Sequence, residues 1–231
     1  MRHLLRWLLA ILLVVTSWPA IQQTASANSG GLAFDGVDDY VTFGPAAGLG
    51  AAQFTLETWF YWTGGGATAG SGSGGITAIP LIAKGRGEAD SNSRDMNYIL
   101  GIIPASGVLA ADFEEGATGA SPGLNHPVTG RTAVTPNVWH HAAVTYDGAT
   151  WQLYLDGKLD ATVAVGQPPR SDSIQHASLG AALTSTGAAE GAFAGTLDEA
   201  RIWNYARSHF QITSNRIFQI TAEPGLIGRW S

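Results

Sequence analysis

Residues 139–165 have the sequence WHHAAVTYDGATWQLYLDGKLDATVAV. Within this stretch, Trp151 and Leu153 alternate with Gln152 and Tyr154, a period of two that is typical of a strand with one packed face and one largely wet face. The dipeptide Asp-Gly occurs twice between the apolar runs, and Asp-Gly favours tight hairpin turns. The stretch therefore predicts three antiparallel strands joined as a meander.

The rest of the chain extends the same pattern. Phe54–Trp62 alternates over nine residues, and 30 glycines and 10 prolines among 231 residues provide many turns. The segment Gly64–Gly75 contains almost only small residues, so we expect a mobile loop there. The sequence predicts an all-β fold, a jelly-roll sandwich of two antiparallel sheets, with one short helix after the last main strand. Further strands are expected at Leu81–Lys84, Tyr98–Ile103, Val108–Phe113, Ser178–Gly180 and Gly195–Trp203, and the helix at Ala206–Ile217.

The composition excludes several classes of function. The formal net charge is −6 and only 13% of residues are charged, without a basic cluster, which argues against nucleic acid as a partner. The chain contains no cysteine, which removes disulfides, zinc-thiolate sites and thiol nucleophiles. The 45% hydrophobic content is sufficient for a full core.

The first 27 residues have the organisation of a secretory signal peptide. Arg2 and Arg6 precede the apolar run Trp7–Val15, and an Ala-Ser-Ala cleavage site ends at Ala27. Because a bilayer span needs about twenty apolar residues, this run is too short for a membrane anchor. We expect a secreted or cell-surface protein that begins at Asn28 and has no membrane span, and an exported protein without cysteine suggests a bacterial source.

Five motifs in a fixed order carry a resemblance to a known family. The motifs are Leu32–Val41, Phe54–Trp59, Asn137–Gly148, Leu153–Lys158 and Gly195–Asn204. Together they resemble the laminin-G-like jelly roll of the concanavalin A-like lectin and glucanase superfamily, over a domain expected at residues 28–222. Residues 223–231 resemble the opening strand of another such module, so we expect a linker or the start of a following module there.

The resemblance implies two packed antiparallel sheets with rim loops that bind sugars, proteins or calcium. It does not imply an activity, because the superfamily includes lectins, adhesion modules, hydrolases and spacers. Glucanases of this superfamily carry two glutamates around an aspartate on one strand, and the chain has no such motif. The nearest string, Glu88-Ala89-Asp90, lies in a polar loop, and no G-x-S-x-G nucleophile motif occurs.

The sequence therefore favours a secreted, non-catalytic recognition module for carbohydrate or an extracellular protein, within a larger exported or surface protein. Two alternatives remain open. The chain could be the accessory domain of a polysaccharide-degrading glycoside hydrolase whose catalytic part lies elsewhere, or a purely structural spacer.

Asp198 is the candidate centre of a metal site. It shares strand parity with Ala200 and Ile202, which places it at the edge of the core, where a carboxylate needs compensation. One structural Ca²⁺ bound by Asp35, Asp39 and Asp198 would supply that compensation. The resemblance implies calcium where the first and last strands meet. The alternative is that Asp198 accepts hydrogen bonds from backbone N–H groups.

Two further side-chain pairs allow more than one interpretation. His140 and His141 are consecutive in a strand, so we expect them on opposite faces, where they cannot share a metal. Trp59 and Tyr61 share one parity and could form a platform that stacks on a sugar ring. Alternatively, these two rings fill an apolar layer beneath loops.

Overall fold

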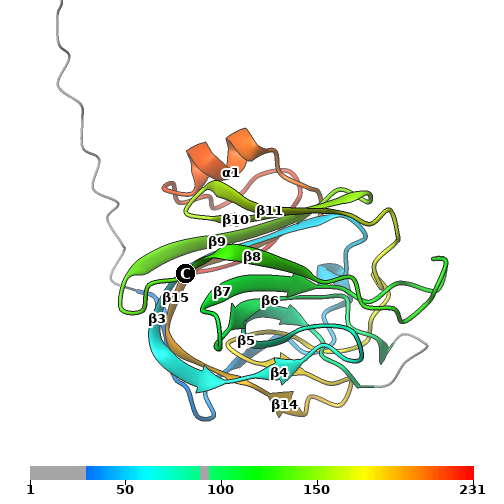
Figure 1. Ribbon diagram of the computed structural model, residues 1–231, viewed down its shortest axis with the longest axis horizontal. Helices are drawn as coiled ribbons and strands as arrows, with labels where there is room; N and C mark the ends of the chain where they lie inside the picture. The colour runs from blue at the N-terminus through cyan, green and yellow to red at the C-terminus, as the bar shows by residue number, and fades with distance from the viewer. Residues whose placement is uncertain (1–29, 89–93) are drawn as a thin grey trace, which may run out of the picture.

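The computed structural model describes residues 30–88 and 94–231. The predicted signal peptide, 1–27, and Asp90 lie outside the described residues. Within the described part, two antiparallel sheets of seven strands each pack face to face (Figure 1). The predicted all-β sandwich is thereby confirmed.

Sheet A contains the predicted meander and both ends of the described chain. Its order is β1-β15-β3-β9-β10-β11, and β16 also pairs with β15. The meander of residues 139–165 forms three successive neighbours in this order, as expected. The strands are β1 (Leu32–Asp35), β3 (Phe54–Ala67), β9 (Trp139–Tyr146), β10 (Thr150–Leu155), β11 (Lys158–Ala164), β15 (Ala192–Trp203) and β16 (Leu226–Trp230).

Sheet B has the order β2-β12-β5-β6-β7-β8, and β4 also pairs with β5. The strand β8 was not expected, because it is an edge strand with little apolar alternation and only Val128 buried. A small ribbon, β13 (Ala182–Leu183) with β14 (Ala189–Glu190), and a short 3₁₀ helix at Ala47–Leu49 complete the connections. The strands are β2 (Val41–Thr42), β4 (Ala69–Gly70), β5 (Thr77–Lys84), β6 (Tyr98–Ile103), β7 (Val108–Asp112), β8 (Val128–Ala133) and β12 (Ala177–Leu179).

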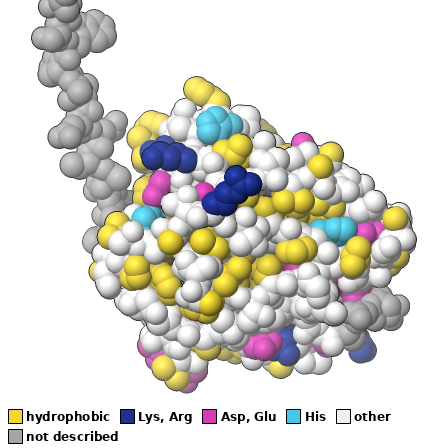
Figure 2. All heavy atoms as spheres, in the orientation of Figure 1, with side chains coloured by type: hydrophobic (Ala, Val, Ile, Leu, Met, Phe, Trp, Pro, Cys, Tyr) yellow, Lys and Arg dark blue, Asp and Glu magenta, His cyan; other side chains and the backbone are white. Residues whose placement is uncertain are grey.

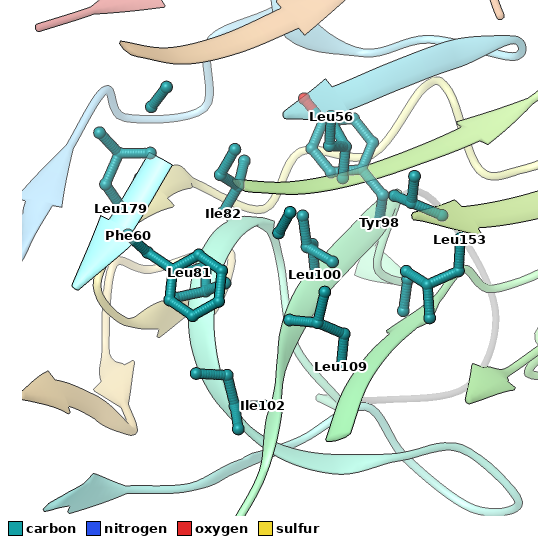
Figure 3. Close-up of a cluster of buried hydrophobic side chains, with 14 of the residues drawn as sticks. Leu56, Phe60, Leu81, Ile82, Tyr98, Leu100, Ile102, Leu109, Leu153 and Leu179 are labelled. Carbon is teal, nitrogen blue, oxygen red and sulfur yellow. The ribbon is translucent and has the colours of Figure 1, made fainter. Parts of the chain in front are cut away.

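The core lies between the two sheets. Leu56 and Leu153 of sheet A meet Leu100 and Leu109 of sheet B, and all four side chains are fully buried (Figure 3). Leu153 therefore faces the core, which confirms the predicted register of the central meander strand. Non-directional burial of such side chains is the main stabilising contribution to a sandwich of this kind.

The outer face of sheet A is covered at Tyr154, although the alternation alone predicted a face largely exposed to water. Tyr154 is fully buried because α1 (His209–Asn215) places Ile212 against it. The helix is shorter than the expected span. It begins after Ser208, whose hydroxyl accepts a hydrogen bond from the Gln211 backbone while the Gln211 side chain returns to the Ser208 N–H.

Two segments without strong apolar patterns are held by backbone pairing. The expected mobile loop at 64–75 instead continues β3 to Ala67 and forms β4, with Gly66 opposite Phe193. Residues 226–230 form β16, which pairs with β15 of this sandwich, where a linker or the start of a following module was expected. Backbone hydrogen bonds to neighbouring strands order such segments, although the side chains of these segments show little periodic pattern.

The surface in Figure 2 carries scattered charges. On this face the Lys and Arg side chains are few and hydrophobic side chains form a broken band across the middle. Among the described residues, no helix combines the length and apolar character that crossing a membrane would require.

Candidate functional site

The structure brings Asp35 and Asp39 together in the turn after β1. The Asp35 carboxylate accepts a hydrogen bond from the Val37 N–H at 2.8 Å, and the Asp39 carboxylate accepts one from the Asp35 N–H at 3.1 Å. With Asp38, these aspartates can place one oxygen each within 4.8 Å of one another, and all three are exposed. These hydrogen bonds to backbone N–H groups stabilise the turn. A metal role for Asp35 and Asp39 stays a prediction.

Asp198 does not join this turn. Asp35 lies opposite Ala194 of β15, and Asp198 lies four residues further along that strand, about 13 Å away at 3.3 Å per residue. Calcium holds its oxygen ligands at about 2.3 to 2.6 Å, so one ion cannot bridge Asp35 and Asp198. The structure therefore does not bring Asp198 together with Asp35 and Asp39.

A β-bulge reverses the facing that strand parity predicts for Asp198. Leu197 and Ala200 both belong to the core, because Glu199 adopts a left-handed backbone conformation with φ 49° and the register shifts between Asp198 and Arg201. Asp198 is consequently on the outer face, contrary to the simple parity. Burial raises the pKa of Asp198, while its carboxylate accepts a hydrogen bond from the Glu199 N–H at 2.8 Å.

The two histidines lie on opposite faces, as expected. The His140 ring packs beside Phe60, and its Nδ1 lies 2.8 Å from the Asp156 carboxylate. His141 is buried on the outer face of sheet A. Their separation rules out a shared metal.

The segment that follows α1 covers one of the two rings of the expected Trp59–Tyr61 platform. The Trp59 indole N–H donates to the Arg216 carbonyl at 2.7 Å, so this ring lies beneath that segment. Tyr61 is half-buried, and its ring centre lies 5.8 Å from that of Trp139, which is also half-buried. Only the Tyr61 end of the expected pair is available, with Trp139 as its neighbour.

A buried ion cluster occupies the outer face of sheet A beneath the same segment. Glu57 Oε1 accepts hydrogen bonds from Arg207 Nη1 at 2.7 Å and from the Trp203 indole at 2.9 Å. Arg201 Nη1 lies 3.4 Å from the same oxygen. Burial by itself would raise the pKa of Glu57, but hydrogen bonding and charge from His141, together with both arginines, lower it to about 2. The charges in this cluster are compensated within the fold.

The region around the turn at residues 71–76 differs from the buried Glu57 cluster because it contains pockets. Two pockets flank the turn at residues 71–76, and Ser73 lines both; we call this region the Ser73 rim. The smaller pocket, about 350 Å³, lies against residues 121–124. The larger pocket, about 580 Å³, is lined by glycine backbone at Gly70, Gly72 and Gly87 and by the side chains of Arg86, Glu88 and Glu190.

Close backbone packing builds the larger pocket. The strands β4 and β14, which supply Gly70 and Glu190, lie side by side at the lower edge of the molecule in Figure 1. The Gly87 N–H donates to the Gly70 carbonyl at 2.9 Å, and a Cβ at Gly87 would lie only 2.6 Å from the Gly72 nitrogen. Glycine is required for this approach, and it leaves backbone polar groups at the pocket wall.

Neighbouring side chains hold the charged groups of the pocket in place. Arg86 forms an ion pair with Glu190. Glu88 accepts hydrogen bonds from the Ser185 hydroxyl at 2.8 Å and from the Gln175 side chain at 3.0 Å. Burial acts in the opposite direction, but these bonds lower the pKa of Glu88. The pocket thus presents preorganised planar polar groups.

Polar side chains at the end of β7 and in the segment that follows it support the turn of the Ser73 rim. Asp112 is fully buried at the end of β7, and its Oδ2 lies 2.5 Å from the Ser71 hydroxyl. Asn125 donates from Nδ2 to the Ser73 carbonyl at 2.9 Å and lies opposite Glu114. The sequence analysis missed this group, because only the chain reversal between residues 113 and 126 brings Asp112 and Asn125 beneath one turn.

The family model for the concanavalin A-like lectin/glucanases superfamily matches residues 35–213. The chain belongs to this superfamily. The match confirms the resemblance of the five sequence motifs. No curated protein matches the chain in sequence.

Solved structures with the same fold include carbohydrate-binding proteins. The CBM40 of the Ruminococcus gnavus IT-sialidase, solved with α2,3-sialyllactose, is 15% identical with a TM-score of 0.58, over 80% of this chain and 96% of that one. A candidate carbohydrate-binding protein from Bacteroides ovatus is 18% identical with a TM-score of 0.57, over 87% of this chain. Our chain spans half the length of the Bacteroides protein. At such identities the likeness shows the fold alone.

Proposed function

We propose that this chain is a non-catalytic carbohydrate-binding module and that a glycan binds in the larger pocket of the Ser73 rim. The observation that carries the proposal is the convergence of Arg86, Glu88 and Glu190 with exposed glycine backbone around 580 Å³. Carboxylates and guanidinium groups form paired hydrogen bonds with planar geometry, and ligand pockets commonly have about 300 to 1,000 Å³. Carbohydrate-binding proteins of the same fold support this assignment.

The charge state of the pocket favours binding over hydrolysis. Glycoside hydrolysis needs one carboxyl group that stays protonated to act as an acid, together with a second, ionised carboxylate. Glu88 has a lowered pKa, and Glu190 is engaged by Arg86. Both glutamates therefore serve as acceptors for sugar hydroxyl groups.

Glycan-array binding of the full chain tests the proposal. We expect retention of a defined glycan class without release of shorter sugars, and a loss of affinity of tenfold or more in Arg86→Ala and Glu88→Gln. Trp139→Ala is the matched control at the aromatic pair, which lies on the outer face of the other sheet, and should bind normally. Loss of binding only in Trp139→Ala would move the site to that face.

Three other outcomes would overturn the assignment. Release of shorter sugars by the full chain would show an enzyme. An array without any retained glycan, together with capture of an extracellular protein, would favour the protein-binding alternative. An absence of both ligands would favour a structural spacer or an accessory domain without its own ligand.

We also infer that the module is exported. The support is the order of Arg2, the apolar run and the cleavage site at Ala27. Mass spectrometry of secreted material should find an amino terminus at Asn28. An intact Met1 on the exported chain would contradict this inference.

A further inference from the structure

The larger pocket of the Ser73 rim is lined by more acidic than basic side chains. Glu88 and Glu190 line it together with one basic residue, Arg86. Arg86 is already engaged, because its Nη1 donates to the Glu190 carboxylate. Among the described residues that line the pocket, no further cation neutralises Glu88. The wall of the pocket therefore has a surplus of one negative charge.

Uncharged groups hold the Glu88 carboxylate in position. The Ser185 hydroxyl donates to Oε1 at 2.8 Å, and the Ser185 N–H and the Gln175 side chain donate to Oε2 at 2.8 and 3.0 Å. Burial acts to raise the pKa of Glu88, but these bonds and the charge of Arg94 lower it overall. Glu88 is therefore ionised at neutral pH. Because a carboxylate has about four acceptor sites, Oε1 can still accept a hydrogen bond from a ligand.

The Arg86 guanidinium has little capacity for a second carboxylate. A guanidinium binds a carboxylate best through two parallel N–H groups. The Nε of Arg86 is inaccessible to solvent, and Nη1 is engaged by Glu190. The side chain is also fixed from behind, since the Gln175 amide bonds both the N–H and the carbonyl of Arg86 at 2.9 Å. An acidic ligand therefore meets Glu88 without a free guanidinium fork to compensate its charge.

The rest of the pocket wall is uncharged. Gly70, Gly72 and Gly87 contribute backbone, and Ser73 carries a hydroxyl. No aromatic side chain is among the described residues that line the pocket. A ligand is therefore held here by hydrogen bonds and not by ring stacking. Sugar hydroxyl groups suit such a wall because each one both donates and accepts.

We propose that the larger pocket of the Ser73 rim selects a neutral sugar unit and rejects a sugar unit that carries a carboxylate, such as a sialic or uronic acid. Hydroxyl groups of a neutral sugar donate to Glu88 and Glu190 and accept from Arg86. A sugar carboxylate only accepts, and it places a second negative charge beside Glu88. Like charges that face each other across an interface disfavour binding. The inference rests on the proposed function and names its class of glycan.

Binding of matched glycan pairs to the full chain tests this selection. The two members of a pair differ in one carboxyl group: oligosaccharides that end in glucose or galactose against those that end in the corresponding uronic acid, and carboxyl-reduced against native α2,3-sialyllactose. In each retained pair we expect the acidic member to bind about tenfold more weakly, or less. A rise in salt from about 0.05 to 0.5 M should narrow the difference, because salt screens exposed charges.

Glu190→Gln separates the effect of charge from that of shape. The substitution removes one negative charge and releases Arg86 from its ion pair. The ratio of neutral to acidic affinity should therefore fall by about tenfold. A ratio measured on one protein sample does not depend on the fraction that is folded. Glu223→Gln is the matched control: it removes the same charge at an exposed position outside the pocket and should leave the ratio unchanged.

Several results would overturn the selection. Tighter binding of the acidic members would show an anionic ligand, and its loss in Arg94→Gln would assign that ligand to Arg94. A preference that neither salt nor Glu190→Gln changes would show exclusion by shape. Equal binding of both members would contradict the selection and retain the carbohydrate function. An array without any retained glycan would contradict the proposed function itself.

Discussion

Glu57 and Asp112 are both fully buried carboxylates, one on the outer face of each sheet, yet their environments differ. Glu57 contacts Arg207, Arg201 and His141, and its pKa falls to about 2. Asp112 has a serine hydroxyl as its side-chain donor, and its pKa rises to about 7. Burial acts in the same direction on both groups, so the cationic partners decide the difference.

The comparison separates a buried carboxylate that has cationic partners from a buried carboxylate that has none among the described residues. The chain that carries α1 covers Glu57, and Arg201 Nη2 also donates to the Phe218 carbonyl at 2.6 Å, so the cluster is tied to its cover. The cover of Asp112 is a glycine-rich turn between two pockets. Glu57 is compensated by cationic side chains, whereas Asp112 has no such side chain beside it among the described residues.

The largest expected effect is on the cluster of Glu57. Glu57→Ala leaves two buried guanidinium groups without their carboxylate, and breaking a buried pair in this way costs about 3 to 5 kcal/mol. Urea denaturation at pH 7 measures this cost. Glu57→Gln is the matched control and should lose less, because its carbonyl still accepts hydrogen bonds. A loss below about 1 kcal/mol for Glu57→Ala would show that water replaces the carboxylate.

The pH dependence of Asp112 is the second prediction. Its pKa rises from an ordinary value of 3.8 to about 7, so its contribution to stability is fully present below pH 4 and is lost as the pH rises through 7. In calcium-free solution, the free energy of unfolding of Asp112→Asn should increase relative to that of the wild type by up to about 1.4 kcal/mol per pH unit in this window. Parallel stability curves for the two proteins would contradict the raised pKa.

Glu57 should show the opposite trend. Its pKa falls from 4.5 to about 2, so its contribution is present above pH 4.5 and is lost as the pH falls through 2. The difference between wild type and Glu57→Gln should therefore narrow in acid. A constant difference down to pH 2 would remove the contrast between the two carboxylates.

A smaller effect is expected at the cap of the helix that covers Glu57. Ser208→Ala removes the hydroxyl of the capping box and should cost about 1 kcal/mol of unfolding free energy. Ser208→Thr retains a hydroxyl and should cost less. An equal loss in both variants would show that the cap contributes through side-chain packing.

The smallest effect is expected for the exposed aspartate turn. Asp38→Asn should leave the melting temperature in calcium-free solution unchanged, because the Asp38 side chain is exposed. A clear change in this variant would show that the Asp35 turn, too, holds a charge that the fold depends on.

The alternation at 139–165 predicted the meander and the side of β10 that faces the core, because inward side chains of a sheet alternate with a period of two. The same rule failed at Asp198, since one left-handed residue, Glu199, reverses the parity of everything after it. It also placed Tyr154 in water, because strand alternation contains no information about α1, which is remote in sequence.

The sequence by itself determined the sandwich, the family and the facing of the central strands, since these follow from local periodicity and from motifs in order. Only the tertiary structure decided which carboxylates are compensated. Glu57 and Arg207 are 150 residues apart, and Asp112 meets Ser71 across 41 residues. The pKa of a buried group depends on the charges within a few ångströms of it, and those neighbours exist only once the two sheets and their covering loops have packed.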